Sequence, residues 1–143
     1  MFIDHRQDYG VAGKAGATSP LDSGYISRLA EFISDAAFHG IYSMPTLQNL
    51  PDNAYFHNIT QGLKPGPNAE FMVSNGLKAW GVYSDLFSAA LATALAPTPP
   101  PMLFSLQNEF SFRGDAWPFN TVGEVVTTSG VFEFEPFFLT PNR

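Results

Sequence analysis

The sequence predicts an α+β fold, in which two N-terminal and central helices precede a Pro-rich connector and a small antiparallel C-terminal sheet or hairpin. Three observations predict it. Apolar residues recur at three- and four-residue spacing in residues 21–39 and 69–96, as on the buried face of a helix. Four prolines fall within residues 97–101 and exclude a helix there. From residue 102 onward apolar residues alternate with others, which is typical of strands.

The chain has the length of one domain. Its 143 residues are 45% hydrophobic, which is enough for a core of its own. We therefore expect a single domain over residues 1–143. Its predicted parts are an extended arm (1–20), a mainly helical part (21–96), the Pro-rich connector (97–101) and a β-rich part (102–143).

The predicted arm contains a Gly-rich stretch, residues 10–20, that consists of small residues without periodicity. This composition is typical of a mobile segment. Such a segment buries little apolar surface of its own, whereas ordering costs about 1–2 kcal/mol per residue. An ordered arm therefore needs a partner surface, and we expect a neighbouring subunit to supply it.

Residues 21–39 have the pattern of an amphipathic helix. Asp22 or Ser23 can cap its first turn, and Gly40 can end it. The predicted apolar face comprises Tyr25, Ile26, Leu29, Phe32, Ile33, Ala36 and Ala37.

The following segment, residues 41–68, is predicted to be a long loop, because its four prolines interrupt any regular element. The loop also contains apolar residues that indicate packing on a core or on a partner. These residues are Leu47, Leu50, Tyr55, Phe56 and Ile59.

Residues 69–96 form the second predicted helical region, whose apolar residues are spread around much of the helix circumference. Gly76 and Gly81 each weaken a helix by about 1 kcal/mol relative to alanine, so we expect two shorter helices, or a bend with close packing at the glycines. The most apolar part, residues 79–96, contains Asp85 and is a poor membrane span.

Three strands are predicted after the connector. Residues 102–113 alternate between apolar and other residues, and residues 121–128 and 131–139 are rich in β-branched and aromatic residues. Ser129 and Gly130 can form the turn between the last two strands. Because three strands make only a small sheet, we expect a strand of a neighbouring chain to complete its edges.

The charge content indicates contact with other proteins. Charged residues make up 14% of the chain, against about 25% in an average soluble domain. A monomer of this size exposes about 7,200 Å², so its surface has about half the usual density of charges, and we expect part of it to face another protein. The net charge of −6 disfavours nucleic-acid partners. The absence of cysteine excludes disulfides, thiolate metal sites and a cysteine nucleophile.

Residues 1–8 lack the basic and apolar regions of a secretory signal peptide. We therefore expect no export by that route.

Catalytic signatures are weak. Asp52 and His57 are the closest candidate acid–base pair. Glu133 and Glu135 lie two apart on a predicted strand, about 7 Å from each other, a separation compatible with paired-carboxylate hydrolysis. We prefer the simpler explanation, an alternating strand with one solvated face. Ser74 has no nucleophile-elbow motif around it.

Ligand-binding motifs are incomplete as well. The histidines His5, His39 and His57 are far apart in the sequence and lack the i, i+4 spacing of metal ligands on a helix, so we predict no metal site and no cofactor. Residues 10–19 resemble a phosphate loop superficially, but Asp8 stands where the motif needs glycine, and Ala15 where it needs a hydroxyl.

Two short motifs have ordinary explanations. Asn58, Ile59 and Thr60 form a glycosylation sequon that we interpret as chance. The Arg113–Asp115 triplet is flanked by Phe112, Trp117 and Phe119, which could form an exposed aromatic patch for a carbohydrate or a protein groove. Core packing is the commoner role of such aromatic residues.

The sequence therefore predicts a non-enzymatic structural subunit that packs through extended arms into a larger oligomeric assembly, with a virus particle (capsid or tail) as the expected setting. Its expected partners are other protein subunits of a homo- or hetero-oligomer, and neither nucleic acid nor a membrane. The alternative is a small hydrolase or small-ligand-binding domain with a pocket near Asp52 and His57. A membrane-associated subunit is the third interpretation. No residue is assigned a catalytic, cofactor-binding or metal-binding role.

Overall fold

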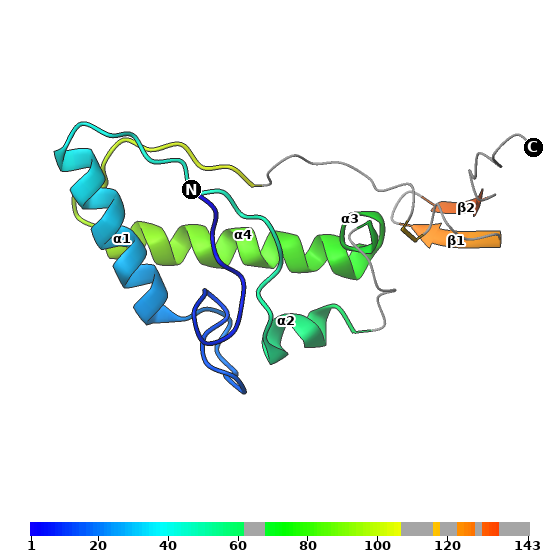
Figure 1. Ribbon diagram of the computed structural model, residues 1–143. Coiled ribbons are helices and arrows are strands. Elements are labelled where there is room, and N and C mark those ends of the chain that lie inside the picture. The colour runs from blue at the N-terminus through cyan, green and yellow to red at the C-terminus, as the bar shows by residue number, and fades with distance from the viewer. Residues whose placement is uncertain (62–67, 107–115, 118–122, 128–129, 135–143) are drawn as a thin grey trace, which may run out of the picture. The chain divides into compact units, whose positions relative to one another are not determined.

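The computed structural model describes residues 1–61, 68–106, 116–117, 123–127 and 130–134. Within them lie four helices and two strands (Figure 1). The helices are α1 (Ser23–Phe38), α2 (Ala54–Ile59), α3 (Ala69–Met72) and α4 (Ser74–Leu95), and the strands are β1 (Gly123–Thr127) and β2 (Gly130–Phe134).

The chain divides into two compact units. The first consists of Met1–Asn58 with Gly81–Glu109, and the second of Ile59–Trp80 with Phe110–Arg143. Helix α4 contributes its first residues to the second unit and the remainder to the first. The single domain expected from the chain length stays a prediction.

The predicted α+β class is wrong, because the described part of the chain is mostly helical. Its antiparallel pairing is limited to β1 and β2, which run in register from Gly123 opposite Phe134 to Thr127 opposite Gly130. Two five-residue strands do not make a sheet layer on which helices can pack. The rest of the predicted strands, residues 107–113, 121–122, 128 and 135–139, lies outside the described residues.

Residues 102–106, predicted to begin a strand, instead lie beside two other extended segments. Isolated parallel bridges join Phe2 to Thr46, Ser43 to Met102, and Thr46 to Ser105. Residues 43–47 are therefore in the middle, between residues 1–3 and 102–105.

Backbone hydrogen bonds hold this middle segment on both sides. On one side the Thr46 amide donates to the Met1 carbonyl at 2.9 Å, and its carbonyl accepts from Ile3 at 3.0 Å. On the other, the Ser105 amide donates to Pro45 and the Ser105 carbonyl accepts from Leu47, both at 3.0 Å.

Pro45 explains why these contacts stay isolated bridges. Proline has no amide hydrogen to donate. The carbonyls of Ser43 and Pro45 therefore accept hydrogen bonds from the amides of Leu103 and Ser105, respectively. Residue 45 donates no hydrogen bond to the opposite segment in return. A regular strand needs that bond, so the alternating pattern after the connector does not develop into a sheet.

Helix α1 confirms the amphipathic helix predicted for residues 21–39. The Asp22 side chain accepts a 2.6 Å hydrogen bond from the Tyr25 amide and caps the first turn. Gly40 follows the helix with a φ of 75°, the left-handed conformation that favours glycine at a helix end. The buried residues are Ile26, Leu29, Ala30 and Ile33.

The N-terminal segment is not an arm that waits for a neighbouring subunit, because the chain's own residues hold it. Val11 and Ala12 are completely buried, and so is nearly all of Ile3. The amide of Asp22 donates to the carbonyl of Val11 at 2.9 Å. The ordering cost that the sequence assigned to a partner is therefore offset within the chain.

Asn53 ties the N-terminal segment to α2. Its Nδ2 donates to the carbonyl oxygens of Ala12 at 3.3 Å and Pro20 at 3.1 Å. Its Oδ1 accepts from the Phe56 amide at 3.2 Å, in the manner of a helix N-cap. Since the side chain is buried, all three bonds are shielded from water.

The predicted loop 41–68 packs as expected in its described part, since Leu47 and Phe56 are buried. It is not free of regular structure, however, because α2 lies within it. Helix α2 follows Pro51 and begins after Asn53, whose side chain caps its first turn. The cap residue indicates a helix here, although the prolines of the segment led to the prediction of a loop.

An aromatic row forms the centre of the first unit. The ring centroids of Phe56 and Tyr83 are 5.6 Å apart, those of Tyr83 and Phe87 are 5.9 Å apart, and those of Phe87 and Phe104 are 5.6 Å apart. The first two pairs meet edge to face, a favoured geometry for aromatic rings. The row joins α2, α4 and the segment that returns after the connector.

The predicted division of the second helical region is present, but it falls at Val73 and not at a glycine. Val73 has extended dihedrals (φ −119°, ψ 152°) and separates α3 from α4. Gly76 lies where α4 touches α3: a Cβ atom there would stand 2.5 Å from the carbonyl oxygen of Glu70. Nothing lies within 4 Å of the corresponding position at Gly81.

Helix α4 ends at Leu95, just before Pro97. Within the described ranges, no helix has both the length and the apolar content that crossing a membrane requires.

Replacing Asn53 by alanine should lower the free energy of unfolding by about 2–3 kcal/mol, because two carbonyls and one amide lose a buried partner. Denaturant unfolding would measure the loss. Asn49→Ala, at an exposed position, is the control and should change stability by less than about 0.5 kcal/mol. Equal effects of the two substitutions would contradict the role of Asn53.

The two glycines of α4 should respond oppositely to alanine. Gly81→Ala should stabilise the protein by up to about 1 kcal/mol, because alanine is the better helix former and has open space there. Gly76→Ala should destabilise it by about 1–3 kcal/mol, since the methyl group meets the α3 backbone. Thermal unfolding of both variants tests the pair, and stabilisation by Gly76→Ala would refute the close approach.

Candidate functional site

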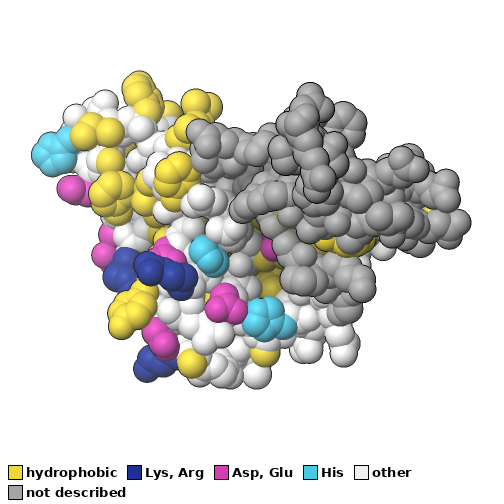
Figure 2. All heavy atoms as spheres, turned by 45° about the vertical axis from the view of Figure 1, so that its right-hand side comes forward, with side chains coloured by type: hydrophobic (Ala, Val, Ile, Leu, Met, Phe, Trp, Pro, Cys, Tyr) yellow, Lys and Arg dark blue, Asp and Glu magenta, His cyan; other side chains and the backbone are white. Residues whose placement is uncertain are grey.

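Six large apolar residues form an exposed surface on the first unit, which we call the apolar face. They come from the N-terminus, from α1 and from the segment that follows α1. Phe38 is 85% exposed, Tyr42 78% and Phe32 57%. The members are Met1, Phe32, Phe38, Ile41, Tyr42 and Met44. Figure 2 shows hydrophobic side chains gathered in the upper left of that view, with most of the charged side chains below them.

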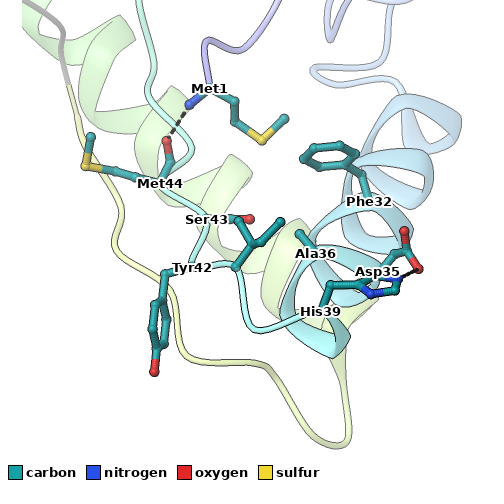
Figure 3. A pocket seen from close by; sticks show the side chains of 9 residues that line it. Met1, Phe32, Asp35, Ala36, His39, Tyr42, Ser43 and Met44 are labelled. Atoms are coloured by element: carbon teal, nitrogen blue, oxygen red, sulfur yellow. Dashed lines mark hydrogen bonds and ion pairs between the residues drawn. The ribbon is translucent and has the colours of Figure 1, made fainter.

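A cavity of about 330 Å³ lies within the apolar face. Met1 and Met44 line one part of it, and Phe32 and Ala36 of α1 line another. Figure 3 shows that the Tyr42 side chain extends away from the cavity. The face therefore combines a hollow with projecting aromatic rings.

The pairing of residues 43–47 builds this face. Gly40 turns the chain back after α1, and the chain then enters the middle extended segment at Ser43. The Met1 amino group donates to the Met44 carbonyl at 3.0 Å, which holds the N-terminus beside the segment (Figure 3). The N-terminus thus meets the consecutive residues 32–44, which are distant from it in the sequence, around one cavity.

The acidic and basic side chains lining the cavity are those of Asp35 and His39. Their Oδ1 and Nε2 atoms are 3.9 Å apart on one turn of α1 (Figure 3). Both side chains are largely exposed, so water screens the pair and it contributes little to stability. The His39 ring also meets Phe38 edge to face at 5.2 Å.

A second cavity, of about 240 Å³, lies between the end of α4 and the returning segment of the first unit. Its lining is almost wholly apolar, and Ser88 supplies the hydroxyl group. Such a lining favours an apolar group and offers little to orient a polar substrate. The lining residues are Ser88, Leu91, Ala92, Leu95, Pro99, Met102 and Phe104.

Asp52 and His57, the predicted acid–base pair, are in contact. The Oδ1 of Asp52 is 3.0 Å from the Nε2 of His57, and both side chains are more than half exposed. Neither residue lines either of the two cavities described above. The pair therefore has the geometry of a surface ion pair, without the enclosed site that general acid–base catalysis uses.

The remaining histidines do not join this pair in a metal site. His5 Nδ1 is 3.3 Å from the Asn49 side-chain nitrogen, and His39 lies at the apolar face. Among the residues that the structure describes, no three His, Asp or Glu side chains form a group that could hold a metal ion.

The Gly-rich segment uses its amide groups internally. The amide of Gly13 donates to the Gly10 carbonyl at 3.2 Å, and that of Ala15 donates to the Asp8 carboxylate at 3.0 Å. A phosphate loop needs such amides to face its ligand, so the segment is a packed turn in this respect.

Other sequence candidates are only partly described. Ser74 is an exposed residue at the start of α4, and Trp117 is half-buried. Glu133 pairs with Glu124 in the backbone register of β1 and β2. Asn58 of the sequon is exposed near the end of α2. Outside the described residues lie Phe112, Arg113, Gly114, Asp115, Phe119 and Glu135.

The sequence analysis missed the apolar face. It assigned Phe32 to the buried side of α1 and did not single out Ile41, Tyr42 or Met44. A signal was available, because Ile26, Leu29 and Ile33 alone complete a buried stripe at helical spacing. Phe38 lies about 140° around the helix from Ile33 and therefore outside that stripe, so α1 carries more large apolar residues than one stripe needs.

Glu70 was also missed, and it lies in the second unit. Burial raises the pKa of its carboxyl group above the ordinary value of 4.5, and the hydrogen bond from Trp80 opposes that rise. The indole Nε1 of Trp80 donates to Glu70 Oε2 at 3.2 Å, while the Trp80 ring stacks on Phe71 at 5.3 Å. These contacts make Glu70 a packed structural group of α3.

Glu70→Gln should stabilise the protein at neutral pH. A raised folded-state pKa means that ionisation of Glu70 costs stability as the pH rises through the ordinary value of 4.5. Glutamine stays neutral and keeps an oxygen that accepts from Trp80. We expect the variant to have the higher melting temperature at pH 7 and an equal one at pH 3. A less stable variant at pH 7 would contradict this electrostatic cost.

The chain matches no protein-family model, and it matches no curated protein and no solved structure. Its function is therefore inferred from its own residues and their placement.

Proposed function

We propose that this protein is a non-enzymatic structural subunit that docks onto other protein subunits through its apolar face. The observation that carries the proposal is the exposure of five large apolar side chains that line a cavity of about 330 Å³, with Phe38 in contact with the lining residue His39. Single exposed apolar residues are ordinary, whereas a contiguous patch of this kind marks an interaction site.

The chemistry of the face supports a protein partner. Interface centres are enriched in Phe, Tyr and Met and depleted in charged residues, and the apolar face consists of Phe, Tyr, Met and Ile. The acidic and basic side chains that line its cavity, Asp35 and His39, stand together on one turn of α1. The low overall charge content of 14% agrees with a chain that hides part of its surface in an assembly.

The mode of docking differs from the one predicted from the sequence. The N-terminal segment is held by Asn53 and the middle extended segment, so it does not supply an extended arm. Contact through a preformed face also requires less ordering on association than an arm does. A virus particle, as a capsid or tail component, stays the proposed setting; it rests on the chain's size and composition and on an analogy with small cysteine-free coat proteins.

The hydrolase alternative has weaker support. Its candidate pair, Asp52 and His57, is in contact at 3.0 Å but lies in solvent. A hydrolase pocket would also need the loop 41–68 to enclose that pair, and residues 62–67 of the loop lie outside the described residues. The apolar face therefore outweighs this pair as a functional surface.

The proposal predicts that a charge on the apolar face prevents assembly. Phe38→Glu should release the chain from its native complex as a species near the monomer mass of 15.6 kDa, because a buried unpaired carboxylate is strongly unfavourable at an interface. The measurement is size-exclusion chromatography with light scattering of the tagged chain, expressed in the cells or particles that contain it.

Tyr9→Glu is the matched control, because Tyr9 is an aromatic residue 78% exposed that is not a member of the apolar face. This variant should stay in the complex. Recovery of the unsubstituted chain as a monomer, or retention of Phe38→Glu in a complex, would refute the proposed function.

A further inference from the structure

The apolar face carries both halves of a self-complementary contact. Its cavity of about 330 Å³ exceeds the roughly 150 Å³ that accommodates a benzene ring inside a protein. Tyr42 lines it and is 78% exposed, and Figure 3 shows its side chain extending away from the hollow. Phe38, 85% exposed, does not line the cavity, but its ring meets that of the lining residue His39 at 5.2 Å. A surface with an aromatic projection next to an aromatic-sized hollow can bind another copy of itself.

The area of the face matches what such a contact needs. An aromatic side chain presents about 150–250 Å², so the six members at their observed exposures present about 700 Å² in all. A standard stable interface buries about 800 Å² on each partner. Two apposed copies of the apolar face, each together with the residues at its rim, reach about that size.

The charge distribution permits two copies to meet there. The chain has a net charge of −6, so two copies repel each other over most approaches. At the apolar face the only acidic side chain lining the cavity is Asp35, and it stands 3.9 Å from His39. The cavity lining therefore brings a single carboxylate of each copy to the proposed contact.

We propose that the apolar face binds a second copy of this chain across a two-fold axis, with the projecting rings of Phe38 and Tyr42 of each copy seated at the cavity of the other. This inference rests on the proposed function and specifies its partner. A two-fold contact uses the same patch on both copies, which is what a hollow and a projection on one face provide.

The purified chain alone tests the partner. Light scattering from micromolar to millimolar concentration should give a mass that rises from 15.6 kDa to twice that value. Phe38→Glu should weaken the dimer by about 100-fold or more, as expected when a charge replaces an aromatic residue that is buried in an interface. Tyr9→Glu should leave the dimer unchanged, and circular dichroism should show both variants folded, since both positions are exposed.

Cross-linking tests the two-fold geometry. The chain has no cysteine, so His39→Cys introduces a unique thiol at the cavity rim. A short bis-maleimide should convert this variant to a covalent dimer, because residue 39 lines the cavity at the proposed contact, and equivalent residues close to a two-fold axis lie close to each other. Tyr9→Cys should remain monomeric under the same conditions. A dimer by mass that is not cross-linked through residue 39 would overturn the two-fold arrangement.

The outcomes separate this inference from the proposed function. A purified chain that stays monomeric up to millimolar concentration, while the native complex still depends on Phe38, overturns the second copy as partner and leaves docking on a different protein. A monomer in both experiments overturns both proposals. A dimer that Phe38→Glu does not weaken places the contact elsewhere and refutes this inference.

Discussion

The hydrogen bonds of residues 43–47 to both neighbours are the constraint on which the first unit depends. Thr46 bonds to the N-terminal residues on one side, while Pro45 and Leu47 bond to Ser105 on the other. These bonds fix the backbone that leaves α1 and place the N-terminus beside it. The cavity of the apolar face lies among these stretches, so it exists only while the pairing holds. Stability of the core and shape of the surface are therefore consequences of the same contacts.

Local signals in the sequence predicted the local structure. Asp22, the apolar spacing and Gly40 all lie within or beside residues 21–39, and they predicted α1 nearly to its ends. The extended segments were not predictable in this way, because their partners are more than forty residues apart and Pro45 interrupts the pattern. Gly76 was correctly predicted as a place of close packing, because it lies against the backbone of Glu70. The break between the two helices, however, is at Val73 and not at a glycine.

The candidate site was harder to predict than the helices, for a physical reason. Apolar periodicity shows that Phe32 is apolar, but it does not show whether the surrounding fold covers it. That depends on where residues 41–44 run, which the long-range pairing decides. Asp52 and His57 were predicted as neighbours because a single turn at the start of α2 separates them. The exposure of the two side chains depends on the rest of the fold, and the spacing of the two residues in the sequence does not predict it.

The position of Asn53 has a consequence for the order of folding during synthesis. The turn at residues 12–20 can form its buried hydrogen bonds to the Asn53 side chain only after Asn53 has been synthesised. Ser105, which pairs with Thr46, is synthesised later still. The first twenty residues therefore leave the ribosome well before the groups that hold them, and the unit closes only after most of the chain has been made. Contacts of such long sequence separation slow folding, and they leave the Gly-rich residues 10–20 of the nascent chain open to chaperones and proteases in the interval.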